Sequence, residues 1–370
     1  MKRLWSINGR FLGREVTGVD RYAREIIGAM DSLISERHPL TTDLKLDLLC
    51  RNKDIPTPNY SNISVRCLPN LPGHIWEQLI LPAYTRGGLL SLCNTGPVMA
   101  GRQIVCIHDQ NIRLAPESYG LPFRTAYRIL QPVLGWRAQK VVTVSCFSKD
   151  TIIEFGVAPA KKIEVIYDGY EHVGLWRPER SSLNRAELPP TFVLVVGSRA
   201  PHKNLAMVSS IAEDLARKGI HVLTVGGVDS AVFARGPQDR LLPTVKHLGR
   251  VDDDTLALLY QSALCLVFPS RTEGFGVPVL EAMALGCPIV SSNAASLPEV
   301  CGEAALYASP DDRNAWLAAI TRISEEPSLR KRLSSLGLQR SKRFSWCAGA
   351  EKFLELMFAM DSANLSMPVR

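Results

Sequence analysis

The chain has 370 residues, and at about 150 residues per domain this length predicts two domains, each large enough to bury a core. Hydrophobic residues make up 46% of the sequence and charged residues 21%, which is an ordinary globular composition and excludes a disordered, a collagen-like and a polytopic membrane protein. The 43 Lys and Arg against 36 Asp and Glu give a formal charge of +7. This excess is compatible with nucleic acid, membrane lipid or a phosphorylated small molecule as partner, and equally with a basic enzyme surface that binds no anion.

The cysteines and the N-terminus bear on the compartment. The nine cysteines form no C-x-x-C pair, so the sequence contains neither a zinc-cluster motif nor a dithiol redox motif, and we expect a reducing cytoplasm. The first nine residues hold too few apolar side chains for a signal peptide, and no apolar stretch approaches the ~18 residues that span a bilayer. We therefore expect a cytoplasmic protein, and peripheral contact with the inner face of the membrane stays open.

Short β-branched runs alternate with helical patterns along the chain, which predicts βαβ units and parallel sheets. In the first half we predict strands at 45–49, 63–68, 103–107, 140–144 and 163–166, and helices at 21–34 and 123–137. In the second half we predict strands at 192–196, 222–225, 245–248, 265–268 and 288–290, and helices at 205–218, 253–262, 279–285, 313–324 and 329–344. The predicted fold class is therefore α/β, with two doubly wound domains.

A polar, proline-punctuated segment without a strand pattern separates the two series and predicts a linker over residues 173–190. We therefore expect an N-terminal domain over residues 1–172 and a C-terminal domain over residues 191–345. Residues 346–370 show the apolar spacing of one more helix.

The strongest chemical signal lies in residues 268–283, which follow a buried-strand pattern and precede a helical one. The segment therefore occupies the carboxyl end of a strand, where α/β sheets bind ligands. Gly274 and Gly276 let the backbone approach a ligand, and the helix start provides amides that attract negative charge. Glu273 suits hydrogen bonds from a polyol, whereas Glu281 suits either a diol such as ribose or a helix-start charge without a ligand.

A second strand–turn–helix segment, residues 195–205, carries Arg199 and Lys203 after its glycine. Two cations at the carboxyl end of a strand can neutralise a diphosphate without a metal ion. The alternative is that both are solvated surface cations.

The acidic triplet Asp252–Asp254 looks like a metal-binding D-x-D motif. It opens a helical pattern, however, where acidic residues cap the helix and complement its dipole. We interpret it as a helix cap, and the sequence predicts no metal site and no cofactor.

These segments resemble the retaining glycosyltransferases of the GT-B fold, glycosyltransferase family 4. Residues 271–281 match the E-x7-E signature of that family, and Gly197, Lys203 and Asn204 match its diphosphate-binding segment. The resemblance covers essentially the whole C-terminal half. It implies two Rossmann-like domains with parallel sheets that face across an interdomain cleft, and a C-terminal helix over 346–370 that returns to the N-terminal domain.

The resemblance also implies roles for residues of the C-terminal half. Lys203 and Arg199 would bind the donor diphosphate, Glu281 would bind the nucleotide ribose, and the donor sugar would be held by Glu273 as a catalytic residue together with the segment Gly274, Phe275, Gly276 and Val277. Many members carry arginine directly after the glycine of the diphosphate segment, whereas here Ser198 follows Gly197. We therefore expect Lys203, rather than Arg199, to be the main phosphate ligand.

In the N-terminal half, Gly18 opens a helical pattern and resembles the glycine loop that faces the donor phosphates in this family. His108 ends an apolar strand pattern. Such a histidine alone is more often structural, but the resemblance implies that it contacts the transferred sugar as a second catalytic residue. Residues 74–78 and 93–97 resemble a subset of bacterial polysaccharide glycosyltransferases, which favours acceptor contact.

The predicted function is metal-independent transfer of a hexose, with retention, from a nucleotide diphosphate sugar to a saccharide or lipid-linked acceptor in bacterial surface polysaccharide (lipopolysaccharide) synthesis. GDP-mannose is the first choice of donor. The alternatives are a glycoside hydrolase with Glu273 and Glu281 as paired acids, a nucleotide-sugar epimerase of the same fold, and a non-catalytic sugar-nucleotide-binding protein. Nucleic acid is not expected as a partner, because the sequence shows no basic stripe with interleaved aromatic residues.

Overall fold

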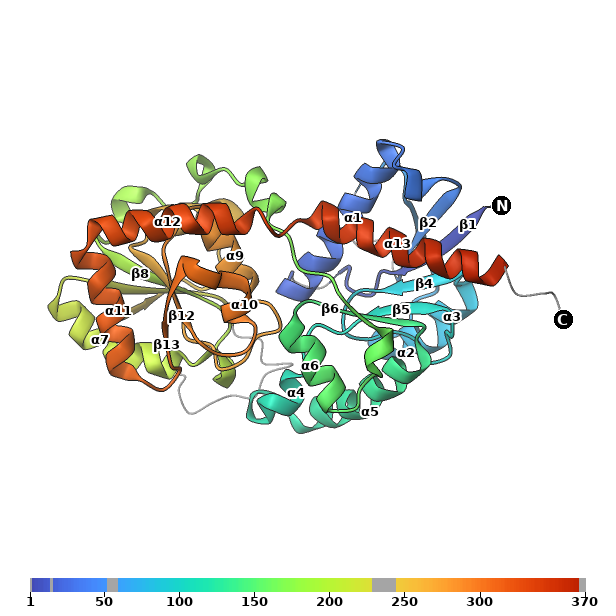
Figure 1. The fold of residues 1–370 in the computed structure, drawn as a ribbon, viewed down its shortest axis with the longest axis horizontal. Helices are drawn as coiled ribbons and strands as arrows, with labels where there is room; N and C mark the ends of the chain where they lie inside the picture. Colours follow the sequence, from blue (N-terminus) through green and yellow to red (C-terminus); the bar gives the residue numbers. More distant parts are fainter. Residues whose placement is uncertain (1, 14–15, 52–58, 228–243, 366–370) are drawn as a thin grey trace. The chain divides into compact units, whose positions relative to one another are not determined.

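The structure is a computed structural model that describes residues 2–13, 16–51, 59–227 and 244–365. The chain divides into two compact units (Figure 1). Unit 1 comprises Met1–Asp109, Ala126–Gly169 and Ser345–Arg370, and unit 2 comprises Gln110–Thr125 and Tyr170–Phe344. Each unit contains a parallel sheet with flanking helices, so the α/β fold class expected from the sequence is confirmed.

Within the described residues, the sheet of unit 1 has the strand order β3-β2-β1-β4-β5-β6-β7, and its strands pair in parallel. The strands are β1 Arg3–Asn8, β2 Leu44–Cys50, β3 Ser64–Cys67, β4 Gly88–Ser91, β5 Gln103–Cys106, β6 Lys140–Thr143 and β7 Ile163–Val165. The chain builds outward from β1 to one edge and then from β4 to the other edge. The carboxyl ends of β1 and β4 therefore mark the switch point, the usual place for a ligand in such a sheet.

Helices cover this sheet and connect its strands. They are α1 Gly18–Ser35, α2 Gly73–Ile75, the π-helical turn η2 Trp76–Ile80, α3 Leu81–Tyr84, α5 Leu121–Arg137, α6 Cys146–Glu154 and α13 Trp346–Leu365, with short 3-10 turns at η1 Pro39–Thr41 and η4 Ala160–Lys162. The terminal helix α13 lies along α1 (Figure 1). The first residue of α13, Trp346, packs directly against the backbone of Gly169. A Cβ on Gly169 would lie 2.0 Å from the backbone nitrogen of Trp346, so this contact requires glycine.

The described part of unit 2 contains a parallel sheet with the order β10-β9-β8-β11-β12-β13. The strands are β8 Phe192–Val196, β9 His221–Val225, β10 Val245–His247, β11 Cys265–Phe268, β12 Ile289–Ser292 and β13 Ala305–Ala308. The chain builds from β8 to one edge and from β11 to the other. The second switch point is therefore at the carboxyl ends of β8 and β11.

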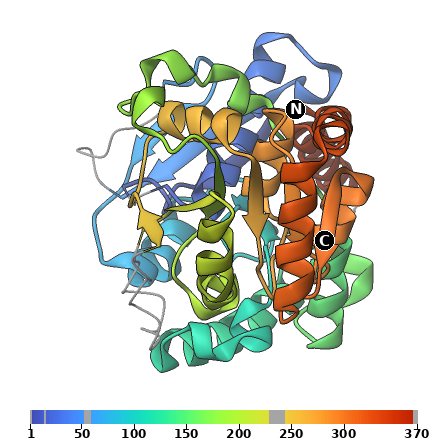
Figure 2. The ribbon, with the colours of Figure 1, turned by 90° about the vertical axis from the view of Figure 1, so that its left-hand side faces the viewer.

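The helices of unit 2 are α4 Asn111–Leu114, α7 Leu205–Arg217, α8 Asp253–Ser262, α9 Val277–Ala284, α10 Leu297–Cys301, α11 Arg313–Glu325 and α12 Pro327–Ser341, with 3-10 turns at η3 Pro116–Ser118, η5 Glu171–Leu175, η6 Pro178–Arg180, η7 Arg185–Glu187, η8 Pro201–Lys203 and η9 Gly302–Ala304. Helices of this unit, among them α7, α9 and α11, pack against its sheet (Figure 2). Ile211 of α7 and Trp316 and Ile320 of α11 are fully buried against Val193 and Val267 of the sheet. Each such aliphatic side chain contributes about 1.5–3 kcal/mol through burial, and this core holds the strand ends in place.

Three observed strands were missing from the prediction: β1, β4 and β13. β4 has the sequence Gly-Leu-Leu-Ser and β13 the sequence Ala-Leu-Tyr-Ala, neither with a β-branched residue, and β1 has only Ile7. Their strand conformation depends on neighbours in the sheet rather than on intrinsic preference. Gly88 in β4 shows this directly, because a Cβ there would lie 2.6 Å from the ring of Trp5 in β1.

The acidic triplet caps α8 as predicted. The Asp252 carboxylate accepts a hydrogen bond from the Thr255 amide at 2.7 Å, in the geometry of an N-cap. Asp254 accepts a hydrogen bond from the amide of Arg177 at 2.6 Å. The helix-cap interpretation is therefore confirmed.

In the part of the chain that the structure describes, no helix combines the length and the apolar character that crossing a membrane would require.

Candidate functional site

The candidate site of unit 2 lies at the carboxyl ends of β8 and β11. The loop after β8 leads through η8 to Lys203, and the loop after β11 leads to Glu273. The Lys203 Nζ lies 2.7 Å from Glu273 Oε1, although 70 residues separate the two in sequence. The ammonium also lies 5.6 Å from the centre of the Phe268 ring, a cation–π contact at the last residue of β11. The fold thus joins the two predicted ligand segments in one partly buried ion pair.

Backbone and amide hydrogen bonds fix these two loops to each other. The Arg271 amide donates to the His202 carbonyl at 2.8 Å. Asn204, which adopts a left-handed conformation with φ 56°, donates from its side chain to the carbonyls of Pro269 at 3.2 Å and Pro310 at 2.8 Å. The loop that carries Lys203 is therefore tied to the loop that carries Glu273 independently of their ion pair.

The glycine-rich turn before α9 is also held from within the unit. The Ser296 hydroxyl lies 3.1 Å from the Glu273 carbonyl oxygen and 3.0 Å from that of Phe275. The Phe275 side chain is buried and packs edge-on against Phe344, with ring centres 5.5 Å apart, so only its backbone can serve a ligand. Gly274 is buried in the same turn.

Gly276 precedes the first residue of α9, Val277. Its φ is 105°, a conformation that favours glycine, and a Cβ there would lie 2.9 Å from Leu297. The start of α9 leaves backbone amides that the helix itself does not use, which suits an anionic or polyol ligand. The predicted segment Gly274–Val277 therefore lies next to the Lys203–Glu273 pair.

Glu281 is buried on the first turns of α9, and both of its oxygens are engaged. Oε1 lies 3.2 Å from His172 Nε2, and Oε2 accepts from the Tyr260 hydroxyl at 3.1 Å. These two contacts hold the carboxylate in a fixed orientation within unit 2. The sequence analysis did not select His172 as a site residue, because nothing distinguishes it there except its position next to the predicted linker. Its ring packs edge-on against Trp176 at 5.4 Å.

Arg199 follows β8 at the same sheet edge but does not join the Lys203–Glu273 pair in any described contact. Its Nε is buried without a hydrogen-bond partner among the described residues. Burial and the charge of Arg199 lower the pKa of His247, the last residue of β10.

A neighbouring histidine, His202, was not selected from the sequence. It is buried directly before Lys203, and burial together with the Lys203 charge lowers its pKa to about 4. Its ring stacks on Tyr119 at 6.1 Å, and its amide donates to the Ser118 hydroxyl at 3.1 Å. His202 therefore joins the turn before Lys203 to η3.

The structure places His108 two residues after the end of β5 in unit 1. Its Nε2 lies 2.8 Å from the Leu92 carbonyl oxygen, which can only accept, so Nε2 carries the proton and Nδ1 presents a lone pair. Burial lowers the pKa of His108 to about 4, so the ring is neutral at physiological pH. The Tyr22 ring packs edge-on against it at 4.7 Å.

Gly18 is the first residue of α1 and is exposed. Thr17 caps the helix, with its hydroxyl 2.7 Å from the Asp20 carboxylate. Among the described residues, a Cβ on Gly18 would meet nothing within 4 Å, so their packing does not require glycine at this position.

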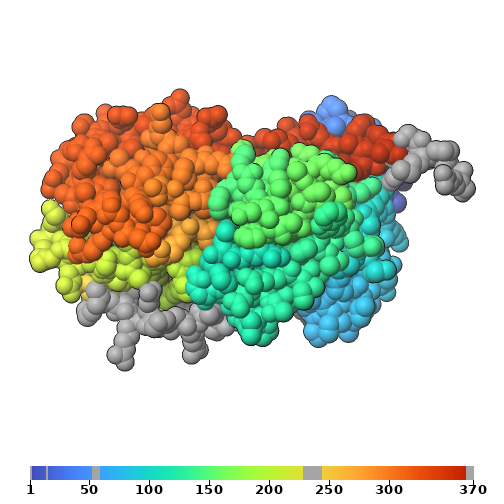
Figure 3. Space-filling view, turned by 60° about the horizontal axis from the view of Figure 1, so that its bottom comes forward, coloured from blue at the N-terminus to red at the C-terminus, as the bar shows by residue number. Residues whose placement is uncertain are grey.

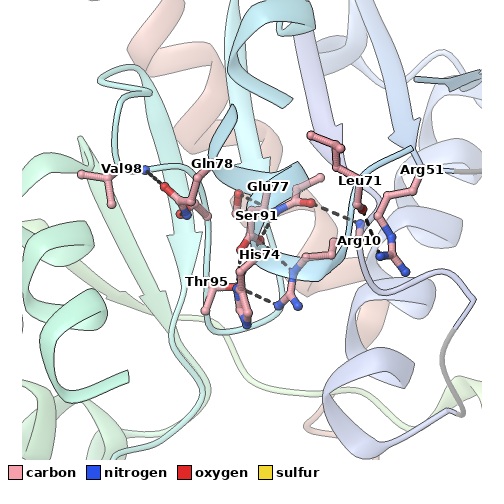
Figure 4. A network of polar contacts seen from close by, with 11 residues as sticks. Arg10, Arg51, Leu71, His74, Glu77, Gln78, Ser91, Thr95 and Val98 are labelled. Carbon is pink, nitrogen blue, oxygen red and sulfur yellow. Dashed lines mark hydrogen bonds and ion pairs between the residues drawn. The ribbon is translucent and has the colours of Figure 1, made fainter. Parts of the chain in front are cut away.

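A buried polar network occupies the switch point of unit 1 (Figure 4). Oε1 of the fully buried Glu77 accepts from Asn8 at 2.7 Å, from Arg10 Nε at 3.0 Å and from Thr95 at 3.0 Å, and Oε2 lies 3.1 Å from His74 Nδ1. Asn8 ends β1, and Thr95 follows β4. The network therefore ties together the loops at the carboxyl ends of these two strands.

The neighbouring Gln78 performs the same task on the loop after β4. Its amide nitrogen donates to the Gly96 carbonyl at 2.9 Å, and its oxygen accepts from the Val98 amide at 2.9 Å. Residues 74–78 and 93–97, both expected to contact an acceptor, are thus bound to each other. Glu77 and Gln78 use their polar groups within unit 1, whereas His74 and Ile75 are exposed.

Comparison with known proteins identifies the family. A family model described as glycosyl transferases group 1 matches residues 178–340. The chain is 32% identical over 261 residues to O-antigen chain mannosyltransferase B of Escherichia coli, covering 66% of this chain and 67% of that relative. The chain belongs to the glycosyl transferases group 1 family. It is also 29% identical over 235 residues to O-antigen chain mannosyltransferase RfbU of Salmonella typhimurium, covering 63% of this chain and 64% of that relative.

The fold of this glycosyl transferases group 1 member is GT-B, with two Rossmann-like parallel-sheet domains. Sucrose-phosphate synthase from Thermosynechococcus elongatus superposes with a TM-score of 0.74 at 19% identity, over 98% of this chain and 100% of that chain. The residues that match the group 1 family include Lys203, Glu273 and Glu281. Gly18 and His108 lie outside the matched residues.

Proposed function

We propose that this protein is a family 4 glycosyltransferase that transfers mannose from GDP-mannose, with retention and without a metal ion, to a saccharide or lipid-linked saccharide of a bacterial surface polysaccharide. We place the reaction in the cytoplasm. The observation that carries the proposal is the Lys203–Glu273 pair at 2.7 Å, which joins the segments that resemble the family's diphosphate and sugar sites. The two relatives named as mannosyltransferases support mannose as the transferred sugar.

Donor binding would break this ion pair, because each of its two side chains would then contact a different group of the donor. The Lys203 ammonium would move to the diphosphate, and Glu273 would accept a hydrogen bond from a sugar hydroxyl. When the bond from C1 to the diphosphate oxygen breaks, its electron pair stays on that oxygen. Lys203, Arg199 and the amides at the start of α9 would stabilise the charge that develops there, without a divalent cation.

The acceptor hydroxyl oxygen would form the new bond to C1 on the face from which the diphosphate leaves. Its proton would pass to the departing diphosphate oxygen, so that charge and protons balance without a covalent enzyme intermediate. Retention of configuration follows from attack on the same face. Neutral His108, with its Nδ1 lone pair, would accept a hydrogen bond from the transferred sugar, and the Gly18 amide would face the donor phosphates.

Glu281 would hold the nucleotide ribose, with His172 and Tyr260 orienting its carboxylate. Its engagement also weighs against the glycoside hydrolase alternative. That mechanism needs two carboxyl groups flanking one bond, about 5–9.5 Å apart, one of them donating a proton. A buried carboxylate that already holds two hydrogen bonds is poorly placed for that role.

Thermal-shift screening against GDP-, UDP- and dTDP-sugars, followed by a transfer assay with the donor that stabilises most, tests the proposal. We expect GDP-mannose to give the largest shift and mannose to appear on an added saccharide acceptor. A preference for a UDP-hexose would contradict the mannose assignment. Conversion of donor without acceptor would identify an epimerase, and binding without any turnover a sugar-nucleotide-binding protein.

A further inference from the structure

Two cysteines meet on neighbouring strands of unit 1. Cys50 is the last residue of β2 and Cys67 is the last residue of β3, and the parallel register pairs them directly. Paired residues of adjacent strands point to the same face of the sheet and lie about 4.8 Å apart, which is within the Cα–Cα range of about 4.4–6.8 Å that disulfides require. The backbone therefore holds the two thiols where a disulfide can form.

The two side chains point toward each other. The Cys50 and Cys67 sulfurs lie 3.2 Å apart across the strand pair. Cys50 Sγ also lies 3.7 Å from the Arg66 carbonyl oxygen, a contact that turns this thiol toward β3. To reach the S–S bond length of about 2.05 Å, the sulfurs need to approach by only about 1.1 Å, which small rotations about the two Cα–Cβ bonds supply. The strands do not have to move for the bond to form.

The two thiols differ in their access to solvent. Cys67 is exposed, whereas Cys50 has no exposed surface. A small oxidant in solution therefore reaches Cys67 first, with the buried thiol of Cys50 already beside it. An exposed cysteine next to a second one that resolves its oxidised form is the arrangement of redox-sensitive sites. Figure 3 shows part of the light-blue stretch of the chain, which includes β3 and the helices after it, on the face turned to the viewer.

We propose that Cys50 and Cys67 form a peroxide-sensitive site, in which hydrogen peroxide converts the two thiols into a reversible disulfide that links β2 to β3. First, the Cys67 sulfur attacks one oxygen of the peroxide, the O–O bond breaks, and a sulfenic acid and one water form. The Cys50 sulfur then attacks the Cys67 sulfur, the S–O bond breaks, and a second water leaves with the Cys50 proton. The two sulfurs together lose two electrons, and these reduce the peroxide. A dithiol reductant reverses the change by thiol–disulfide exchange.

The strand pairing favours this disulfide over further oxidation of Cys67. Attack by a sulfur held 3.2 Å away is intramolecular, so it competes well with a second peroxide molecule. The Leu68 amide donates to the Cys50 carbonyl at 2.8 Å, and Arg66 pairs with Asp47 at 3.1 Å, so β3 stays on β2 during the reaction. In a reducing compartment the pair remains as thiols until an oxidant is present. Neither cysteine belongs to the proposed donor site, so this inference and the proposed sugar transfer can succeed or fail independently.

Peptide mapping of the full chain after peroxide treatment tests the inference. The reduced protein is treated with hydrogen peroxide, its remaining thiols are blocked with N-ethylmaleimide, and it is digested with trypsin without a reductant. Trypsin cleaves after Arg51 and Arg66, so the disulfide would join peptide 46–51 to peptide 67–86. We expect mass spectrometry to show this linked pair as the main disulfide, and treatment with dithiothreitol before blocking to abolish it.

Two variants and a control separate the roles of the thiols. Cys67→Ser should form no linked pair. Cys50→Ser leaves Cys67 without a resolving thiol, so its conversion to sulfinic and sulfonic acid, which dithiothreitol does not reverse, should rise at least about tenfold over the wild type at the same peroxide dose. The control Cys347→Ser, at another exposed cysteine, should form the linked pair as the wild type does.

Three outcomes would overturn the inference. They are absence of the linked pair from the peroxide-treated wild type, a main disulfide between other cysteines, and equal irreversible oxidation of Cys67 in the wild type and in Cys50→Ser. Circular dichroism checks that each variant is folded. If the buried substitution Cys50→Ser prevents folding, the wild-type peptide map decides the matter together with Cys67→Ser, which changes an exposed side chain.

Discussion

Replacing the buried Glu77 by glutamine should lower the free energy of unfolding by about 3 kcal/mol. The carboxylate has no exposed surface. Its oxygens form hydrogen bonds with four side chains, those of Asn8, Arg10, Thr95 and His74. Burial alone would raise its pKa, but the hydrogen bond from His74 and the charge of Arg10 outweigh burial and lower it. Glutamine keeps the size and the Oε1 acceptor but leaves the Arg10 guanidinium, itself buried, without a counter-charge. Removing one partner of a buried ion pair costs about 3–5 kcal/mol, and the retained hydrogen bonds favour the lower end.

Urea unfolding of the wild type and the Glu77→Gln variant, followed by circular dichroism, measures this change. The matched control is Glu326→Gln, which breaks the exposed pair of Glu326 with Arg322 at 3.1 Å and should cost less than about 0.5 kcal/mol. Adding Arg10→Met to Glu77→Gln should recover part of the loss, because the unpaired buried charge is then removed as well.

The same experiment distinguishes two roles for Glu77 within residues 74–78, contact with the acceptor and anchoring of the buried network. If Glu77→Gln unfolds at wild-type urea concentration but transfers sugar poorly, with a raised KM for the acceptor, Glu77 contacts the acceptor and the anchoring role is wrong. A loss of stability with a normal acceptor KM in the folded fraction agrees with the network seen here.

Further predictions concern histidine titration, the Glu281 contacts and the α8 cap. Burial lowers the pKa of His108 and of His202 from 6.5 to about 4, so both are neutral in the folded state and protonate more readily when unfolded. Stability should be full above pH 6.5 and fall by about 3 kcal/mol per histidine as the pH drops from 6.5 to 4, which urea unfolding across that range checks; a flat profile would contradict it. Tyr260→Phe should cost about 1.5 kcal/mol of stability and raise the donor KM more than it lowers kcat; an unchanged KM would separate Glu281 from the nucleotide. Asp252→Ala should cost about 1 kcal/mol, and no loss would show that the cap is dispensable.

The success of sequence prediction followed the local strength of the pattern. β8 and β11 were predicted with their observed bounds, Phe192–Val196 and Cys265–Phe268, because a short run of apolar residues only, between turn residues, favours a buried parallel strand. The strand β4 was not predicted, because Gly88 lowers the intrinsic strand propensity of its sequence. The structure requires glycine there, since a Cβ would clash with the ring of Trp5 on the neighbouring strand. Trp5 is 83 positions away in sequence, so no local pattern could indicate this requirement.

For the candidate site, too, the sequence indicated single residues in local motifs but not the contacts between distant ones. Lys203 and Glu273 were each selected from glycine turns after strands, and the structure adds their ion pair. His172 and Glu281, which are in contact, lie 109 positions apart in sequence, so no local sequence pattern predicts that contact. In unit 1, Glu77 belongs to a segment that the sequence analysis expected to contact an acceptor, and Asn8 was not selected. Only the fold shows that the two share one network.

The most direct test of the account is the steady-state rate of mannose transfer from GDP-mannose by the Lys203→Ala variant. The control is Lys218→Ala, because Lys218 also forms an ion pair, with Glu325 at 3.8 Å, but on the surface of unit 2. We predict that Lys203→Ala lowers kcat/KM at least about a hundredfold with thermal unfolding close to the wild type, while Lys218→Ala transfers normally. Transfer by a folded Lys203→Ala variant at a rate near that of the wild type would contradict the donor site described here.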